Sequence, residues 1–299
     1  MPTDVSAKLV MQLRSSTGLP MMKCKEALET NGGDFEKAVE WLRKKGLETA
    51  AKKADRAMKE GRVAIKTSAD GKVAAMIQIA CETEPVSNTP EFLGLVDDLA
   101  DAALASSADS TDLAVGAVLA QPLEDRPDTA DVVIKHMVAK IGENIALQRA
   151  ARLHTRGGRL ATYLHHNAKT GVLVEVEGPT AALSSEAADA FLKDVRLQIA
   201  SSKPAGLSKV DVPQGVVDKE LEIYREQAKQ DPKMAGKPAP VVEKIVLGKL
   251  DKFFAERCLL EQAWIHDDKL SVADALEAAG AKAGGALSIR RFALFQVGA

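Results

Sequence analysis

One pattern, two strands joined by a tight turn and followed by an amphipathic helix, occurs twice in the chain and constrains its fold more than any other feature. Apolar and polar residues alternate at 61–67, as in a half-buried strand, and the apolar run at 73–81 forms the return strand. A second pair of strands follows at 158–166 and 171–177. The second copy starts about one hundred residues after the first, so the sequence predicts an α+β fold with two similar, duplicated core subdomains. The apolar stripes of the two helices are Phe92, Val96, Leu99 and Ala103, and Ala188, Phe191, Val195 and Ile199.

The segments around the two copies have patterns of their own. Residues 106–130 are expected to form a loop-rich excursion, and the apolar stripe after them predicts one long helix over 132–152, with Gly142 at a point of close packing. A strand-like run at 286–297 is expected to complete the second sheet. In the second strand pair, the expected facing residues are Leu160, Thr162 and Leu164 on one strand and Val172, Val174 and Val176 on the other.

The N-terminal segment, residues 4–46, predicts three short helices. Apolar residues recur there at helical spacing in three runs, which the glycine-containing segments at 17–20 and 31–33 separate. Asp34 is expected to cap the third helix and Gly46 to end it. The chain is therefore expected to begin with a compact three-helix module.

Two helical stretches within residues 213–260 flank a proline- and glycine-containing segment at 231–238, which cannot continue a helix. This arrangement predicts an inserted antiparallel helical hairpin. We therefore expect a module at 1–50, a core subdomain at 51–155, and a second core subdomain at 156–299 that carries the hairpin. The expected coiled-coil seams are Val217, Leu221, Tyr224 and Ala228 on one arm and Val246, Leu250, Phe253 and Leu260 on the other.

A polar segment follows the first strand pair abruptly. After the apolar residues of 77–81, the sequence continues with Glu82, Thr83, Glu84 and Pro85, and the strand places these residues at a sheet edge. From the local sequence, such a segment forms either a rigid binding loop or a polar turn between a strand and a helix.

Composition limits the classes of partner. The 40 basic and 42 acidic residues give a net charge of −2, which provides no overall attraction to nucleic acid or to anionic membranes. The three cysteines are widely separated and never form a Cys-x-x-Cys pair, which argues against a disulfide framework and a cysteine-based zinc site. No apolar run approaches the roughly 20 residues that span a bilayer, and the N-terminus lacks the apolar core of a signal peptide. We expect a cytoplasmic protein with a protein or small-molecule partner.

The sequence contains no recognisable catalytic motif. It lacks a phosphate-binding Gly-x-x-x-x-Gly-Lys-Ser/Thr loop, a His-Glu-x-x-His zinc motif and a Gly-x-Ser-x-Gly elbow. The neighbouring His165 and His166 would point to opposite faces of a strand, so they are not expected to bind one metal ion. No metal, no cofactor and no enzymatic side-chain chemistry are expected.

Short motifs along the chain resemble those of one protein family. Residues 13–18 (Leu-Arg-Ser-Ser-Thr-Gly) and 21–28 (Met-Met-Lys-Cys-Lys-Glu-Ala-Leu) closely resemble the N-terminal signature of the elongation factor Ts family, the exchange factors for the translational GTPase elongation factor Tu. The resemblance spans nearly the whole chain, and the order and spacing of the motifs make it specific. The further landmarks lie at 140–145, 163–165, 171–174, 243–246 and 295–298.

The resemblance implies a fold and a set of contacts with the GTPase. It implies a ubiquitin-associated-like fold for the N-terminal module, a core loop inserted beside the partner's magnesium site, and core residues that press on a neighbouring helix. From the residues alone, the two methionines of the module suit helix packing and an interface equally, and its lysine is expected to be exposed. The matching residues are Met21, Met22 and Lys25 in the module, Thr83, Glu84, Pro85 and Val86 in the loop, and Ile141 and His165 in the core.

The loop departs from the family pattern at two positions. Where the family has Thr-Asp-Phe-Val, this chain has an acid one methylene longer, Glu84, and the small ring of Pro85 in place of an aromatic side chain. Insertion by Pro85 would be shallower than insertion by an aromatic ring. Because buried aromatic rings contribute strongly to interfaces, exchange is then expected to depend more on Ile141, on His165 and on the N-terminal module.

The leading hypothesis is a cytoplasmic guanine nucleotide exchange factor that releases GDP from elongation factor Tu, with no direct contact to nucleic acid or membrane. The alternative is a stabiliser or chaperone of the same fold that holds the GTPase and has weak exchange activity. The small side chain of Pro85 suggests this alternative. An adaptor for ubiquitin-like proteins is disfavoured, because it leaves the signatures at 140–298 unexplained. A homodimer through the helical hairpin or the core stays open.

Overall fold

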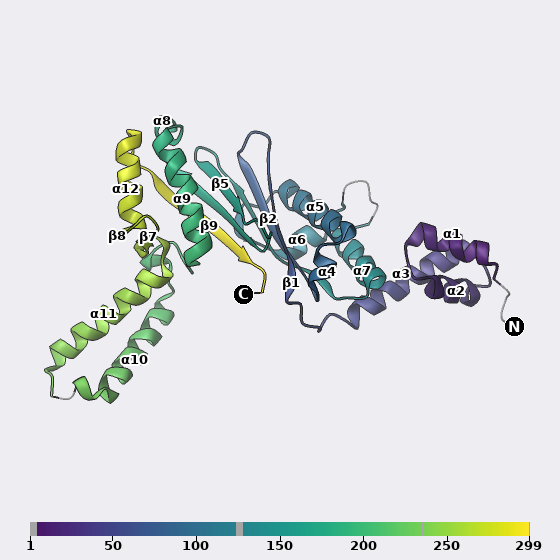
Figure 1. The fold of residues 1–299 in the computed structure, drawn as a ribbon, viewed down its shortest axis with the longest axis horizontal. Helices are drawn as coiled ribbons and strands as arrows, with labels where there is room; N and C mark the ends of the chain where they lie inside the picture. The colour runs from purple at the N-terminus through teal and green to yellow at the C-terminus, as the bar shows by residue number, and fades with distance from the viewer. Residues whose placement is uncertain (1–4, 124–127, 235, 299) are drawn as a thin grey trace.

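The computed structural model describes residues 5–123, 128–234 and 236–298, and it combines helices and sheets in an α+β fold (Figure 1). Three helices come first, as predicted: α1 (Ala7–Thr17), α2 (Met21–Thr30) and α3 (Phe35–Ala51). Gly18 ends α1 in the left-handed conformation, and the Asp34 carboxylate caps α3 by accepting the amide of Lys37. Their shared core consists of Val10, Leu13, Cys24, Ala27, Leu28, Ala38 and Leu42.

The third helix does not end at Gly46, so that prediction is wrong. It continues to Ala51 and passes α7 (Ala130–Ile141), where a Cβ atom at position 46 would lie 3.3 Å from the Cβ of Ala139. Gly46 therefore allows two helices to approach closely and does not act as a cap. This contact joins the N-terminal helices to the rest of the molecule.

The first sheet is antiparallel, with its strands in the order β1-β2-β4-β3. Three helices, α5, α6 and α7, cover one face of it, with a core that includes Ile77, Ile79 and Cys81 of β2, as the strand period predicts. Thr89 caps α5 and Pro90 opens it. The elements of this part are β1 (Glu60–Thr67), β2 (Val73–Cys81), α4 (Glu84–Ser87), α5 (Pro90–Ala105), β3 (Ser110–Leu113), α6 (Val115–Leu119), α7 and β4 (Ile145–His154).

Two predictions for this part are wrong. The single helix expected over 132–152 is in fact α7 followed by β4, because Gly142 takes a φ of +92° and ends the helix. The loop-rich excursion expected at 106–130 contains β3 and α6, while its residues 124–127 lie outside those that the structure describes. Strand β4 pairs along its length with β2 and fills the middle of the sheet.

The second sheet is also antiparallel, in the order β5-β6-β9, and α9 and α12 cover its outer face. The C-terminal strand completes this sheet, as predicted. The predicted register of the first pair is wrong by one residue: Leu160 lies opposite Glu175, and Leu164 lies opposite Gly171. The elements are β5 (Arg159–Leu164), β6 (Thr170–Glu177), α8 (Thr180–Leu183), α9 (Glu186–Ser202), β7 (Ala263–Trp264), β8 (Asp267–Ser271), α12 (Val272–Ala283) and β9 (Ser288–Gln296).

The two sheets pack face to face, so the core has four layers: helices, sheet, sheet, helices (Figure 1). A cluster between the sheets contains Met76 and Leu153 from the first and Leu173 and Phe295 from the second, all fully buried. At Gly171 the sheets come so close that a Cβ atom would lie 2.5 Å from a methyl group of Val63. Because the inner faces of the two sheets bury each other, the sheets keep one fixed arrangement.

The predicted helical hairpin extends away from the sheets (Figure 1). It consists of α10 (Gln214–Gln230) and α11 (Ala239–Arg257), with the short 3₁₀ turns η1 (Lys209–Asp211), η2 (Pro232–Met234) and η3 (Leu259–Glu261) around them. Val246, Leu250 and Phe254 are buried, while Phe253 is only partly buried, so the seam follows Phe254 at that turn. Within the described residues, no helix has the length and apolar character needed to cross a membrane.

Candidate functional site

The polar segment after β2 is held against a second turn by two hydrogen bonds to one carboxylate. The backbone amide of Thr83 donates to Oε2 of Glu143 at 3.0 Å, and the Thr83 hydroxyl donates to Oε1 at 2.6 Å. Glu143 belongs to the turn between α7 and β4, which the antiparallel pairing of β2 with β4 brings to the same end of the sheet. The carboxylate thus fixes the start of α4 through both of its oxygens.

A further hydrogen bond joins the same two segments, and here the donor belongs to the turn between α7 and β4. The Glu82 carboxylate accepts the backbone amide of Asn144 at 2.6 Å, and Nη1 of Arg56 lies 3.5 Å from the same carboxylate oxygen. The hydrogen bond from Asn144, followed by the positive charges of Arg56 and Lys53, lowers the pKa of Glu82 against the opposing effect of burial. Glu82 is therefore a carboxylate at neutral pH and serves as an internal anchor.

The residues after Thr83 form one helical turn, α4, so the segment is a compact turn that connects β2 to α5. Glu84 and Pro85 are exposed at the first positions of this turn, and Val86 is partly buried against the first core. The carbonyl of Glu84 accepts hydrogen bonds from the Ser87 hydroxyl at 2.7 Å and from the Asn88 side chain at 3.0 Å. A carboxylate and a small ring therefore stand exposed on a well-anchored turn.

Ile141 lies beside this turn, at the last residue of α7, and packs partly buried against the first core. The Lys53 ammonium, from the segment after α3, donates to the carbonyl of Gly142. Burial lowers the pKa of Lys53, and the Arg56 charge lowers it further. The end of α7 thus contacts both the polar turn and the segment that leads to the N-terminal helices.

His165 lies in the turn between β5 and β6, beyond the last residue of β5. Its Nδ1 lies 2.5 Å from the Tyr163 hydroxyl, and its ring centroid lies 4.2 Å from that of His166. The expectation that the two histidines point to opposite faces is therefore wrong, because both belong to the turn and not to the strand. In the parts of the chain that the structure describes, no group of three or more His, Cys, Asp or Glu side chains is placed to hold a metal ion.

The turn that carries His165 lies close to the polar turn. The amide of Val63 in β1 donates to the carbonyl of Ala168 at 2.7 Å, and the Lys169 ammonium donates to Glu60 at 2.6 Å. The pKa of Lys169 is raised, mainly by the Glu60 carboxylate and with a further contribution from Glu84. Figure 1 shows α4, the start of β1 and the C-terminus at this same edge of the molecule.

The residues expected in the N-terminal module lie on α2 and are exposed. Met21 is 45% and Met22 73% exposed, which favours a surface role over helix packing for both. Lys25 is exposed as predicted, and its Nζ lies 3.6 Å from Oε1 of Glu29. Lys23 lies in the motif at 21–28 but was assigned no role there; its ammonium donates to the carbonyl of Ala139 at 3.2 Å and attaches α2 to α7.

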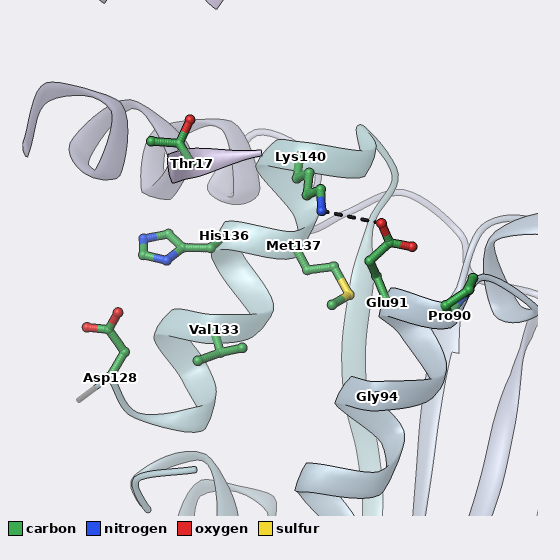
Figure 2. A pocket seen from close by; sticks show the side chains of 9 residues that line it. All are labelled: Thr17, Pro90, Glu91, Gly94, Asp128, Val133, His136, Met137 and Lys140. Atoms are coloured by element: carbon green, nitrogen blue, oxygen red, sulfur yellow. Dashed lines mark hydrogen bonds and ion pairs between the residues drawn. The ribbon is translucent and has the colours of Figure 1, made fainter. Parts of the chain in front are cut away.

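A groove of about 630 Å³ separates the N-terminal helices from α5 and α7 (Figure 2). Lys140 of α7 and Glu91 of α5, both in its lining, form an ion pair at 3.4 Å. Figure 2 shows His136 extending from α7 between Thr17 and Asp128, and its Nε2 is buried with no hydrogen-bond partner among the described residues. Burial lowers the pKa of this histidine. The groove lies between two units of the fold and contains no nucleophile paired with a base among the residues that line it.

Motif searches by residue type could not find Glu143 and Asn144, because both act on groups about 60 positions away in the sequence, a separation that only the sheet closes. The available signal was their place in the motif at 140–145, which sequence analysis singled out without assigning these two residues a role.

Comparison with known proteins gives one consistent result. A family profile described as "Elongation factor TS" matches residues 82–299. The chain is 41% identical to the elongation factor Ts of Nitratidesulfovibrio vulgaris strain DP4, covering 98% of this chain and 96% of that protein. It is 42% identical to the elongation factor Ts of Methylococcus capsulatus, over 99% and 92% of the two chains, and 38% identical to that of Chlorobium phaeobacteroides, over 99% and 100%.

Proposed function

The chain belongs to the elongation factor Ts family, and we propose that it is a cytoplasmic guanine nucleotide exchange factor that releases GDP from elongation factor Tu. The observation that carries the proposal is similarity to elongation factor Ts proteins over almost the entire chain. Release of a fluorescent GDP analogue from the GTPase tests it directly.

Exchange of this kind requires linkage and no chemical step. A protein that binds the nucleotide-free GTPase more tightly than the GDP-bound form must weaken GDP binding by the same factor. The protein then needs a rigid surface that fits only the nucleotide-free form. The anchored carboxylates and helices described above supply such a surface without a nucleophile, a metal or a cofactor.

We assign the central contact to α4. Its exposed Glu84 carboxylate is suited to compete for a divalent cation or to repel the phosphates that the cation neutralises, since like charges at short range oppose each other. Pro85 beside it is a small apolar surface. The two bonds from Thr83 to Glu143 support this role, because a turn that is already fixed loses little conformational entropy when it inserts into a partner.

We assign further contacts to residues that surround α4 at a distance. We propose that Ile141 at the end of α7 and His165 in the β5–β6 turn press on an element of the GTPase next to its magnesium site, and that Met21 and Met22 offer it an adaptable apolar surface on α2. Lys25 adds a positive charge beside them. Contacts at these separate points would explain how a chain with a small wedge retains exchange activity.

We also propose that the three N-terminal helices act as a ubiquitin-associated-like module, and that the two strand-pair units, 51–155 and 156–299, are duplicated subdomains. The repeated order of two strands, a one-turn helix and a long helix in each unit supports this organisation. A homodimer through the hairpin or the core stays a prediction.

A holding function with weak exchange is the second candidate, and exposed Pro85 in place of an aromatic residue favours it. The Pro85→Phe variant distinguishes the two. Under the holding function the wedge has been lost, so the larger ring should accelerate GDP release about tenfold, equivalent to about 1.4 kcal/mol of added transition-state stabilisation. Under the leading proposal the contacts around α4 replace the wedge, so we expect the variant to release GDP at the wild-type rate.

The matched control for this variant is Pro213→Phe, which also adds a ring at an exposed proline but precedes the hairpin. Binding of the GTPase is measured separately, by titration without nucleotide. Tight binding by the wild type with GDP release at the spontaneous rate would establish the holding function and contradict exchange.

A further inference from the structure

We propose that Glu143 and Asn144 are positioning residues for exchange, and that their turn between α7 and β4 fixes α4 relative to the N-terminal helices. This proposal rests on the proposed function where it concerns exchange. Its structural part, that one turn holds two distant segments in place, stands on hydrogen bonds alone.

The backbone and the side chain of Asn144 donate hydrogen bonds to two different segments. Its amide donates to Glu82, at the start of the polar turn, at 2.6 Å. Its side-chain nitrogen donates to two carbonyls of the segment between α3 and β1, those of Ala54 at 3.1 Å and Arg56 at 3.0 Å. The side-chain amide has two N–H donors, one for each of these carbonyls, and the residue is only 5% exposed.

Glu143 positions α4 by accepting hydrogen bonds from its N-cap residue, which makes no ordinary side-chain cap in the part of the chain that the structure describes. Thr83 occupies the N-cap position of α4, yet among the described residues no amide of that helix donates to its side chain. Its hydroxyl and its amide both donate to Glu143 instead. A bidentate interaction with a carboxylate is directional, so it fixes the orientation of α4 as well as its location.

The N-terminal helices reach this turn through the segment that follows α3. Lys53 donates to the carbonyl of Gly142, and Arg56 lies 3.5 Å from Glu82. The turn therefore connects, within three residues, the segment that follows α3 and the segment that begins α4. A surface made of two such parts can discriminate between two forms of a partner only while the parts keep their relative position.

The structural part is tested first, by hydrogen–deuterium exchange on the full chain. Asn144→Asp keeps the shape of the side chain, removes both donated hydrogens and places a charge against two carbonyls, while Glu143→Gln removes one of two acceptors. We expect each variant to accelerate exchange in both segments, 52–59 and 84–88. Unchanged exchange in either segment for both variants would overturn the proposal, whatever the GTPase assay gives.

The functional part is tested by an affinity ratio. The dissociation constant for the GDP-bound GTPase is divided by that for the nucleotide-free GTPase, and we expect both variants to lower this ratio by about fivefold or more. A residue that only stabilises the fold would weaken both affinities alike and leave the ratio unchanged, which would overturn the positioning role. A wild-type ratio of one would instead reject the proposed function, and the hydrogen-exchange result would still decide the structural claim.

The chain offers a matched control. Asp274 accepts the backbone amide and the hydroxyl of Ser271, at 2.8 and 2.7 Å, as Glu143 accepts those of Thr83, but it does so with one carboxylate oxygen and within a local capping box. It lies at the start of α12, on the outer side of the second sheet. Asp274→Asn is expected to lower stability comparably while the affinity ratio and the exchange of residues 84–88 stay as in the wild type. An equal fall of the ratio in this control would contradict the proposal.

Discussion

Three neighbouring acidic residues have different roles that their type alone does not reveal. Glu82 and Glu143 accept hydrogen bonds from the chain itself, whereas Glu84 is exposed beside them. Sequence analysis could predict the exposure of the segment, since polar residues follow an apolar strand. It could not separate the anchors from the contact residue, because that difference depends on the α7–β4 turn about 60 residues away in the sequence.

The pH dependence of stability at His136 gives a prediction for a single residue. Burial lowers the pKa of its imidazole below 6.5. The charge of Asp128 acts to raise this pKa, and the charge of Arg43 lowers it further. The unfolded chain therefore binds a proton on this residue at higher pH than the folded chain does. The contribution of His136 to the free energy of unfolding is complete above about pH 6.5 and is lost as the pH falls.

We expect the free energy of unfolding to decrease from about pH 7 to about pH 5 more steeply in the wild type than in His136→Gln, which cannot titrate. Denaturant titrations at each pH measure the two slopes. Equal slopes would show that His136 does not contribute to the pH dependence.

At the scale of elements, the errors of sequence analysis have identifiable causes. Strand β4 is rich in Ala, Leu, Gln and Arg, which favour helices, and Ile145 continues the stripe of Ile141 at helical spacing. Pairing with β2 overrides that preference once Gly142 has ended α7. The register of β5 and β6 depends on the turn at 165–169, so the strand pattern alone could not fix it.

Several other elements were predictable because local and tertiary preferences agree there. The caps at Asp34, Thr89 and Ser271 form where polar residues precede apolar stripes, and the stripes of α5 and α9 are buried as their spacing indicates. The helical hairpin follows from its central proline and glycine residues.

The hairpin gives a prediction for one element. Leu250 is 8% exposed in the seam between α10 and α11, whereas Leu247 on the same helix is 47% exposed. Leu250→Ala should lower the free energy of unfolding of the hairpin by about 2–3 kcal/mol, because it removes buried apolar contacts and leaves a cavity.

Leu247→Ala, with the same change in composition and helix propensity, should alter stability by less than about 0.5 kcal/mol. Thermal and denaturant unfolding followed by circular dichroism compare the two variants. Equal losses would mean that α11 does not pack on α10 through this seam.

At the scale of the molecule, the candidate surface is assembled from segments that the fold brings to one edge. Packing of the two sheets places the His165 turn beside β1, and the α3–α7 contact places α2 beside the end of α7. The residues proposed to bind the partner could be named from motifs. Their relative placement required the four-layer core, because it depends on contacts between segments far apart in the sequence.

We expect this chain to release GDP from elongation factor Tu, and stopped-flow release of a fluorescent GDP analogue measures this activity. The GTPase of the same organism is loaded with the analogue and mixed with excess unlabelled GDP and a substoichiometric amount of this chain. Chelation of magnesium in a parallel sample verifies that the bound analogue can be released. We predict that each molecule of the chain releases many analogue molecules, at a rate proportional to its concentration. Release at the spontaneous rate at every concentration of the chain would contradict the account.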